Sequence, residues 1–555
     1  MNGAQIMVES LKKEGVDIIF GYPGGVLLPF CDQLYDSGIK FVLVRHEQGA
    51  AHAVDGFARS SGRVGVCMAT SGPGATNLVT GIATAYMDSI PLVAITGQVA
   101  THLIGSDAFQ EVDITGITRP ITKHNYLIKD AKDIARTVKE AFYIASSGRP
   151  GPVLIDLPVD VQRAEAKFEY PEKIEMRSYK PTYEGHPVQI ERAAKLIKES
   201  KKPLLIAGGG VISANASAEL KKFIETAGIP VTFTLMGLGS IPANHPLFLG
   251  MLGMHGTKYA NYAVVESDLI ISAGCRFDDR ITGKIENFAP RAKIIHIDID
   301  PASISKNIVV DVPIVGDAKE ILKKLHEKTG KTSRKEWLSK IKEWKEKYPL
   351  SYEKNGLKPQ YIIEKLSGML PDDAIICTEV GQNQMWTAQY YKFKKPRTLV
   401  TSGGLGTMGF GFPAAIGAQM ANPGKIVVDI AGDGSIQMNI QELATAVYNK
   451  LPIKIIILNN CCLGMVRQWQ QLFYKQRYAF TCVENAQPDF AKLAEAYGAI
   501  GHRVTSTDEF DKIIPEVLKE KIKPVILDCR IVEDENVFPM VPAGASLDHM
   551  LEGLA

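Results

Sequence analysis

The sequence predicts an α/β protein made of three doubly wound domains, each built on a parallel sheet. Short apolar runs of strand length alternate with stretches of helical periodicity in three separate parts of the chain. Several runs end in Gly, Asp or Asn, which tolerate the tight turn from a strand into a helix. The length of 555 residues also exceeds what one hydrophobic core supports. We therefore expect domains at residues 1–167, 188–330 and 357–555.

The first domain is expected to contain a strand–turn–helix–strand unit. Residues 63–69 and 91–95 have the apolar character of buried strands, and residues 76–87 have helical spacing. Another strand is expected at 40–44, just before a helix rich in small residues.

The last domain loosely repeats this order. Strands are expected at residues 425–431 and 453–458, with a helix at 438–448 between them. Two similar units in one chain suggest that a ligand lies between them, either within one chain or across a dimer.

The central domain is expected to contain strands at residues 202–207, 229–234, 269–273 and 293–299. Gly208, Gly209 and Gly210 follow the first of these strands. They lack the complete GxGxxG fingerprint, so they are weak evidence for a dinucleotide. The predicted linkers are the Pro-, Glu- and Lys-rich stretch 168–187 and the charged stretch 319–358.

Composition excludes several classes of protein. Hydrophobic residues make up 45% of the chain and charged residues 22%, as in soluble globular proteins, and no apolar stretch is long enough for a membrane span. A net charge of +2 without a basic block does not support a nucleic-acid partner. The eight cysteines include no Cys-x-x-Cys pair, so neither a zinc site nor a disulfide framework is indicated. Without a signal-like N-terminus, we expect a cytoplasmic protein.

Asp433 and Asn460 directly follow the two strands expected in the last domain. Because parallel strands joined by a helix place their carboxyl ends on one edge of the sheet, the two side chains should lie close together. A carboxylate and an amide oxygen are hard ligands that Mg²⁺ accepts alongside phosphate. Gly434 and Ser435 precede the helix, where free N–H groups favour an anion. The alternative is that Gly-Asp and Asn-Asn are ordinary turn residues.

This pattern resembles the GDG and NN motif of thiamine diphosphate enzymes. Such enzymes need a carboxylate that activates the pyrimidine ring of the cofactor, and Glu47 is the candidate in the string 46–50. The alternative for Glu47 is a helix-start residue favoured by the helix dipole. His46 receives no role.

The whole chain resembles the catalytic subunits of acetohydroxyacid synthases, also called acetolactate synthases. The matching strings are 20–25, 46–50, 70–77, 106–111, 148–152, 250–256, 276–280 and 464–470. The resemblance implies a thiamine diphosphate-binding fold with a pyrimidine-binding, a central FAD-binding-like and a diphosphate-binding domain. It also implies a homodimer or tetramer with cofactor sites at the subunit interface, and a small regulatory subunit as a possible partner.

Carried over to this sequence, the resemblance assigns Glu47 to cofactor activation and Asp433, Asn460 and the backbone carbonyl of Cys462 to the metal. It places the following residues around thiamine diphosphate: Gln382, Asn383, Gly406, Met408, Gly434, Ser435 and Met465. For Met408 taken alone, core packing is the more common explanation.

The family also binds FAD, in a role that is mainly structural. The resemblance assigns flavin contacts to Arg149, His255, Arg276, Asp298 and Asp317. For Arg149 the alternative is a surface loop residue.

Substrate contacts are assigned to two groups of residues. Gly25, Phe109 and Gln110 match positions near the reacting atoms. Arg280 matches the arginine that binds the carboxylate of the second 2-oxo acid, and Trp469 matches the residue that favours 2-oxobutanoate. One departure is Val159, where many relatives have Lys, which puts substrate and flavin affinity in doubt.

The resemblance implies decarboxylation of pyruvate and condensation of the two-carbon unit with a second 2-oxo acid. The products would be 2-acetolactate or 2-aceto-2-hydroxybutanoate, which lead to valine, leucine and isoleucine. The alternatives are a catabolic acetolactate synthase without FAD, a pyruvate oxidase, a glyoxylate carboligase and an inactive scaffold protein. Glyoxylate carboligase is disfavoured because it lacks the activating glutamate, and the retained Glu47, Asp433 and Asn460 disfavour the scaffold.

Overall fold

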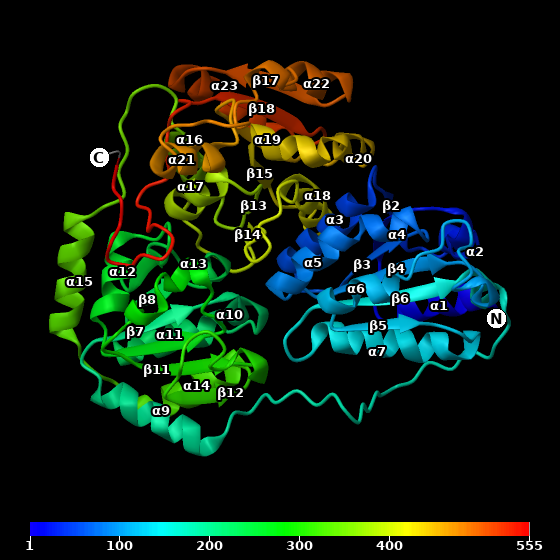
Figure 1. Ribbon diagram of the computed structural model, residues 1–555, viewed down its shortest axis with the longest axis horizontal. Helices are drawn as coiled ribbons and strands as arrows, with labels where there is room; N and C mark the ends of the chain where they lie inside the picture. Colours follow the sequence, from blue (N-terminus) through cyan, green and yellow to red (C-terminus); the bar gives the residue numbers. More distant parts are fainter. Residues whose placement is uncertain (554–555) are drawn as a thin grey trace.

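A computed structural model describes residues 1–553 and contains three six-stranded sheets, all of them parallel (Figure 1). In Figure 1 the first domain (blue to cyan) lies on the right, the central domain (green) at the lower left and the third domain (yellow to red) at the top. The predicted fold class is confirmed. No helix among residues 1–553 is both long and apolar enough to cross a membrane.

The first sheet has the order β2-β1-β3-β4-β6-β5. Its strands are β1 (Ile18–Tyr22), β2 (Lys40–Leu43), β3 (Gly65–Ala69), β4 (Leu92–Gln98), β5 (His124–Leu127) and β6 (Pro152–Pro158). The helices are α1 (Gly3–Lys13), α2 (Leu28–Tyr35), α3 (Glu47–Ser61), α4 (Pro73–Asn77), α5 (Val79–Asp88), α6 (Ile114–Thr118), α7 (Ile134–Ser146) and α8 (Val159–Arg163). The helix expected at 76–87 is thus divided in two.

The central sheet has the order β12-β11-β10-β7-β8-β9. Its strands are β7 (Pro203–Ala207), β8 (Val231–Phe233), β9 (Phe248–Met251), β10 (Leu269–Ala273), β11 (Lys293–Asp298) and β12 (Val312–Val315). The helices are α9 (Pro187–Glu199), α10 (Gly209–Ser213), α11 (Ser217–Ala227), α12 (Lys258–Glu266), α13 (Asp279–Thr282), α14 (Ala318–Thr329) and α15 (Lys335–Lys347). The charged stretch 319–358 is therefore largely helical, and α15 packs inward through Trp337, whose Nε1 donates to the carbonyl of Pro203 at 3.0 Å.

The third sheet has the order β14-β13-β15-β16-β18-β17. Its strands are β13 (Ile375–Thr378), β14 (Leu399–Val400), β15 (Val427–Gly432), β16 (Lys454–Asn459), β17 (Ile500–Val504) and β18 (Val525–Arg530). The helices are α16 (Pro359–Met369), α17 (Gln382–Tyr390), α18 (Gly411–Ala421), α19 (Asp433–Ile436), α20 (Leu443–Tyr448), α21 (Gly464–Phe473), α22 (Phe490–Ala496) and α23 (Thr507–Lys519).

Continuous apolar sequence explains the central strands. Strands β4, β6 and β16 are buried along their whole length, as expected where helices cover both faces of a parallel sheet. The edge strand β5 is partly exposed. Because all strands of each sheet are parallel, their carboxyl ends lie at one edge of that sheet.

The first and third domains of the chain pack directly through helices α3 and α18, which lie side by side in Figure 1. A Cβ atom added to Gly417 would lie 1.7 Å from the carbonyl oxygen of Ala53, and one on Gly56 would lie 2.0 Å from that of Ala414. Small residues therefore bring the two helix backbones into contact. At the start of α3, the Glu442 carboxylate accepts the backbone N–H of Arg45 at 2.9 Å. The third domain therefore contacts α3 both along its length and just before its first residue.

Candidate active site

Asp433 and Asn460 follow two neighbouring strands of the third sheet. Strand β15 ends at Gly432 and β16 at Asn459, and the two strands pair in parallel. Both side chains therefore lie at the carboxyl edge of the sheet, where they line one small cavity. Cys462 lines the same cavity, and its backbone N–H donates to Asn460 Oδ1 at 3.2 Å.

Asp433 is only 1% exposed, so its carboxylate is buried. Burial raises the pKa of Asp433 to about 7. The Gln487 side chain donates to Asp433 Oδ2, and Asn459 Nδ2 donates to Gln487 Oε1 at 3.1 Å. Sequence reasoning missed Gln487, because it lies in an irregular segment before α22 that carries no motif. A cation beside Asp433 would offset the cost of burying its charge.

Three helix N-termini border the small cavity. Helices α17, α19 and α21 begin at Gln382, Asp433 and Gly464, all of which line it. The first N–H groups of a helix lack backbone partners and favour an anion. An added Cβ would lie 2.7 Å from Leu463 Cδ2 if placed on Gly434, and 2.1 Å from Gln382 Oε1 if placed on Gly464. The missing side chains of these two glycines therefore let Leu463 and Gln382 lie close to the backbone in the cavity wall.

The other residues that the resemblance assigned to thiamine diphosphate in this domain also border the cavities. Asn383, Met408, Gly434 and Ser435 line the small cavity, and Gly406 lines a larger one. Met465 lines both, so the two cavities adjoin.

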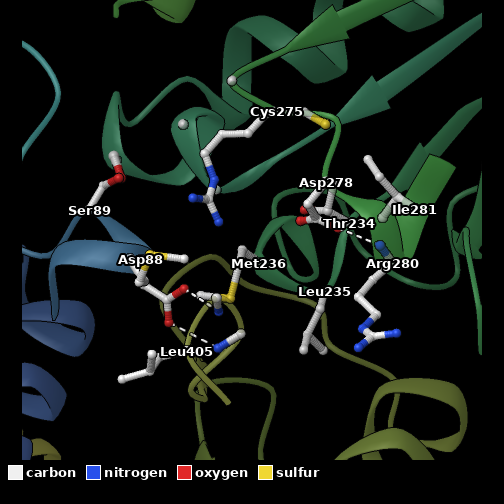
Figure 2. A pocket seen from close by; sticks show the side chains of 18 of the residues that line it. Asp88, Ser89, Thr234, Leu235, Met236, Cys275, Asp278, Arg280, Ile281 and Leu405 are labelled. Atoms are coloured by element: carbon white, nitrogen blue, oxygen red, sulfur yellow. Dashed lines mark hydrogen bonds between the residues drawn. The ribbon is translucent and has the colours of Figure 1, made fainter. Parts of the chain in front are cut away.

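The larger cavity has a volume of about 740 Å³ and lies where the three domains meet. This is within the range of about 300–1,000 Å³ typical of small-molecule sites. Figure 2 shows Asp88 and Ser89 from the first domain, Thr234 and Arg280 from the central domain and Leu405 from the third around it. Its wall includes all residues that the resemblance assigned to the flavin and the second substrate: Arg149, His255, Arg276, Arg280, Asp298, Asp317 and Trp469.

The wall of the larger cavity carries charges of both signs: three arginines (Arg149, Arg276 and Arg280) and five aspartates (Asp88, Asp278, Asp279, Asp298 and Asp317). Arg149 donates to Ser89 Oγ at 2.8 Å and forms an ion pair with Asp300 at 3.1 Å, so it is a structured cavity residue and not a loose surface arginine. Burial lowers the pKa of His255 to about 4, which keeps the ring neutral. Its Nδ1 is buried and has no hydrogen-bond partner among residues 1–553. Burial raises the pKa of Asp298 to about 6.

The glycine-rich turn after β7 also borders the larger cavity, although its sequence lacks the full dinucleotide fingerprint. Gly209 and Gly210 line the cavity. A Cβ on Gly210 would lie 2.6 Å from the Cα of Gly274, so the loops after β7 and β10 approach closely. The incomplete motif therefore forms part of the cavity wall. Asp88 is a further wall residue that no local pattern indicated.

Glu47 lines neither cavity. It is the first residue of α3, capped by His46, and Asn77 Nδ2 donates to Glu47 Oε2 at 2.9 Å. This placement agrees with a helix-start residue and leaves the catalytic assignment open. Close by, the Thr70 hydroxyl is buried without a hydrogen-bond partner.

The remaining substrate candidates of the first domain also lie outside both cavities. Phe109 is 88% exposed, and Gln110 adopts a left-handed backbone with φ of 58°. Gly25 begins a short 3₁₀ helix and has open space beside it. Val159 opens α8 directly after β6 and lines neither cavity. A single chain therefore does not assemble all the predicted site residues.

Comparison with known protein families covers all three domains. Residues 1–117 match the thiamine pyrophosphate enzyme N-terminal TPP binding domain, residues 190–325 the central domain, and residues 379–529 the C-terminal TPP binding domain.

Individual relatives match over the whole chain. The chain is 53% identical to the "Probable acetolactate synthase large subunit" of Methanocaldococcus jannaschii, covering 100% of this chain and 95% of the relative. It is 50% identical to the acetolactate synthase large subunit of Haemophilus influenzae, covering 99% of this chain and 98% of that relative. It is 52% identical to the acetolactate synthase large subunit of Corynebacterium glutamicum, covering 98% of this chain and 89% of that relative. With three thiamine pyrophosphate domains in order and full-length identity near half, the chain belongs to the acetolactate synthase large subunits of the thiamine pyrophosphate enzyme family.

Proposed function

We propose that this chain condenses two 2-oxo acids as an acetolactate synthase, with thiamine diphosphate, Mg²⁺ and FAD as cofactors. The observation that carries the proposal is the small cavity, where Asp433 and Asn460 meet three helix N-termini beside a larger cavity lined by arginines. We also propose domain boundaries at residues 1–167, 188–330 and 357–555, each range enclosing one of the three sheets.

The residues of the small cavity fit a magnesium diphosphate. Asp433 supplies a buried carboxylate, Asn460 an amide oxygen and Cys462 a backbone carbonyl, which are the oxygen ligands that Mg²⁺ prefers. The missing side chains of Gly434 and Gly464 let Leu463, Gln382 and Asn460 lie close to the backbone at this site. When bound, thiamine diphosphate supplies the carbon nucleophile and the electron sink for loss of CO₂. The chain's task is to hold, orient and desolvate the reactants.

Glu47 is assigned to the proton transfer that activates the cofactor, with Asn77 orienting one of its carboxylate oxygens. Because Glu47 does not line the small cavity of its own chain, we propose that a second copy supplies the missing half of each site. The 88% exposure of Phe109 supports this arrangement, since such a side chain is usually covered by a partner or ligand. Gly25, Phe109 and Gln110 would then reach the reacting atoms across the interface.

The larger cavity fits a flavin dinucleotide. Its volume of about 740 Å³ is adequate, Arg149 and Arg276 offer cations to a diphosphate, and the unpartnered Nδ1 of His255 offers a polar contact. Asp298 and Asp317 offer hydrogen-bond acceptors in the same cavity wall.

The second 2-oxo acid is assigned to the part of the larger cavity near Met465. Arg280 would bind its carboxylate, and Trp469 would pack on the additional methyl group of 2-oxobutanoate. One methylene is worth roughly 1–3 kcal/mol, so the preference over pyruvate has a limited size. Replacement of Trp469 by Leu should reduce this preference in a competition between the two acids, while Arg280→Gln should weaken both acids alike.

The decisive experiment identifies the product. The purified protein is incubated with pyruvate, Mg²⁺ and thiamine diphosphate, with and without FAD, and the products are identified by NMR. We expect 2-acetolactate, formed only when FAD is present. Acetolactate formation without any bound flavin would favour the catabolic alternative, and oxygen-dependent peroxide formation would favour a pyruvate oxidase.

Assembly and location are further parts of the proposal. The relatives are named large subunits. We propose that this chain forms a homodimer or tetramer that binds a small regulatory subunit, and that it resides in the cytoplasm.

A further inference from the structure

Two cysteines that are distant in sequence face each other at the rim of the small cavity. Cys462 and Cys482 form an antiparallel backbone bridge. The N–H of Leu463 donates to the carbonyl of Thr481 at 2.9 Å, and the N–H of Val483 donates to that of Cys461 at 2.9 Å. These two hydrogen bonds lie on either side of the cysteines, and Cys462 and Cys482 do not bond to each other through their own backbone groups. They therefore form a non-hydrogen-bonded pair of the antiparallel type.

Residues in such a pair have Cα atoms about 4.5 Å apart and side chains on the same side of the ribbon. Disulfides require Cα separations of roughly 4.4–6.8 Å. The expected Cα separation of Cys462 and Cys482 thus lies near the short end of the range for disulfides, so the bond can form without a change of fold. Both residues are free thiols in the structure.

The neighbouring Cys461 is unsuited to this pairing. Cys461 adopts a left-handed backbone with φ of 59°, so it does not continue the extended pairing that Cys462 makes with Cys482. Cys461 is buried and its Sγ lies 3.7 Å from Asn459 Oδ1, whereas Cys462 is partly exposed and Cys482 is exposed. A small reagent can therefore reach Cys482 first.

We propose that Cys462 and Cys482 are a reversible dithiol–disulfide pair that reacts with low-molecular-weight disulfides. The Cys482 thiolate attacks one sulfur of the reagent, forming a mixed disulfide and releasing one thiol. The Cys462 thiolate then attacks Cys482 Sγ, which closes the internal disulfide and releases the second thiol. Two electrons pass from the cysteines to the reagent, and the two protons of the cysteines end on the two released thiols. A small dithiol reverses the reaction.

The internal disulfide closes a ring that contains helix α21. This helix carries Met465 and Trp469, which line the larger cavity. The segment that returns to Cys482 turns through three left-handed residues, Lys475, Gln476 and Phe480, and is held to α21 by the Gln470 side chain, whose Nε2 donates to the carbonyl of Ala479 at 2.9 Å. Oxidation would tie this segment covalently to the loop between Asn460 and α21. The thiol chemistry itself does not depend on the proposed reaction.

The test is covalent and needs no activity measurement. The full-length holoprotein is incubated with excess oxidised glutathione, free thiols are alkylated, and a non-reducing tryptic digest is analysed by mass spectrometry. We expect peptides 455–467 and 478–492 to be joined in the wild type, and to separate after treatment with dithiothreitol.

Matched variants identify the partners. The cross-link should persist in Cys461→Ser, because that thiol is buried beside Asn459. It should disappear in both Cys462→Ser and Cys482→Ser. Glutathione left on Cys482 as a mixed disulfide, with no joined peptides, would overturn the proposal. A cross-link that survives in Cys462→Ser would assign the bond to Cys461 and would also overturn it.

Discussion

The contact between α3 and α18 predicts a large effect from the smallest possible substitution, Gly417→Ala. The added Cβ would lie 1.7 Å from the carbonyl oxygen of Ala53 and 2.9 Å from the backbone nitrogen of Phe57. Since real Cβ atoms essentially never approach closer than 3.0 Å, the first contact must lengthen by at least 1.3 Å (3.0 minus 1.7). The obstructing atoms are backbone, so no side chain can rotate away.

The size of the effect follows from two opposing contributions. Overpacking of a core typically costs up to about 3 kcal/mol, and a clash with backbone belongs at that upper end. The better helix propensity of Ala returns about 1 kcal/mol. The net loss of about 2 kcal/mol should accelerate amide hydrogen exchange in α3 and α18 by about 30-fold, since 1.4 kcal/mol is a factor of ten.

The matched control is Gly368→Ala in helix α16. Its added Cβ would meet no atom within 4 Å, so only the gain in helix propensity of about 0.5–1 kcal/mol remains. Exchange in α3 and α18 should not change in this variant. If exchange of these helices in Gly417→Ala stays within about threefold of the wild type, the close contact is not what joins the two domains.

Three further predictions concern charged groups. Glu47→Ala should lower acetolactate turnover by about 100-fold or more while thiamine diphosphate and Mg²⁺ still bind, as titration calorimetry can show; near-normal turnover would remove Glu47 from the mechanism. Asp433→Ala should weaken binding of the magnesium diphosphate by more than about tenfold, and undiminished binding would mean that the metal ligand was misidentified. Burial, together with the neighbouring Glu379 carboxyl, holds the pKa of the buried Asp429 well above its usual range, and burial also raises the pKa of Glu379. Because both folded pKa values exceed the unfolded ones, the contribution of these two groups to stability is greatest in acid and is lost as the pH rises through the folded values. Asp429→Asn should therefore raise the melting temperature more at pH 8 than at pH 5. Converted to free energy of unfolding, the gain at pH 8 should exceed the gain at pH 5 by at least about 1 kcal/mol. Equal shifts at both pH values would contradict this prediction.

The parts of the fold that follow from local sequence were predictable. The strands expected at 425–431 and 453–458 are β15 and β16, displaced by one or two residues, because continuous apolar runs have few alternatives to a buried strand. The helix expected at 438–448 begins only at Leu443. Asn439 departs from helical geometry with φ of −135°, and its side chain donates to the carbonyl of Gly409 at 2.7 Å. That contact comes from a distant segment, which periodicity does not register.

The residues of the candidate site likewise include some that local sequence predicted and some that it did not. Asp433 and Asn460 were found because they end neighbouring strands, and the rule for parallel sheets then places them on one edge. Asp88 lines the larger cavity from the end of helix α5, and Gln487 donates to Asp433 from an irregular segment. Neither residue belongs to a motif. Glu47 was found only through the family resemblance, because a glutamate at a helix start has a common structural explanation.

The separation of Glu47 from the small cavity of its own chain has a genetic consequence. If each site combines Glu47 of one chain with Asp433 of another, two inactive variants can repair each other. Coexpression of chains carrying Glu47→Ala and Asp433→Ala should yield mixed dimers with one fully intact site and one doubly defective site. Random assembly predicts recovery of about one quarter of wild-type activity, whereas a site made within one chain would give none. Two alleles of this gene that each abolish growth without branched-chain amino acids would then support growth together.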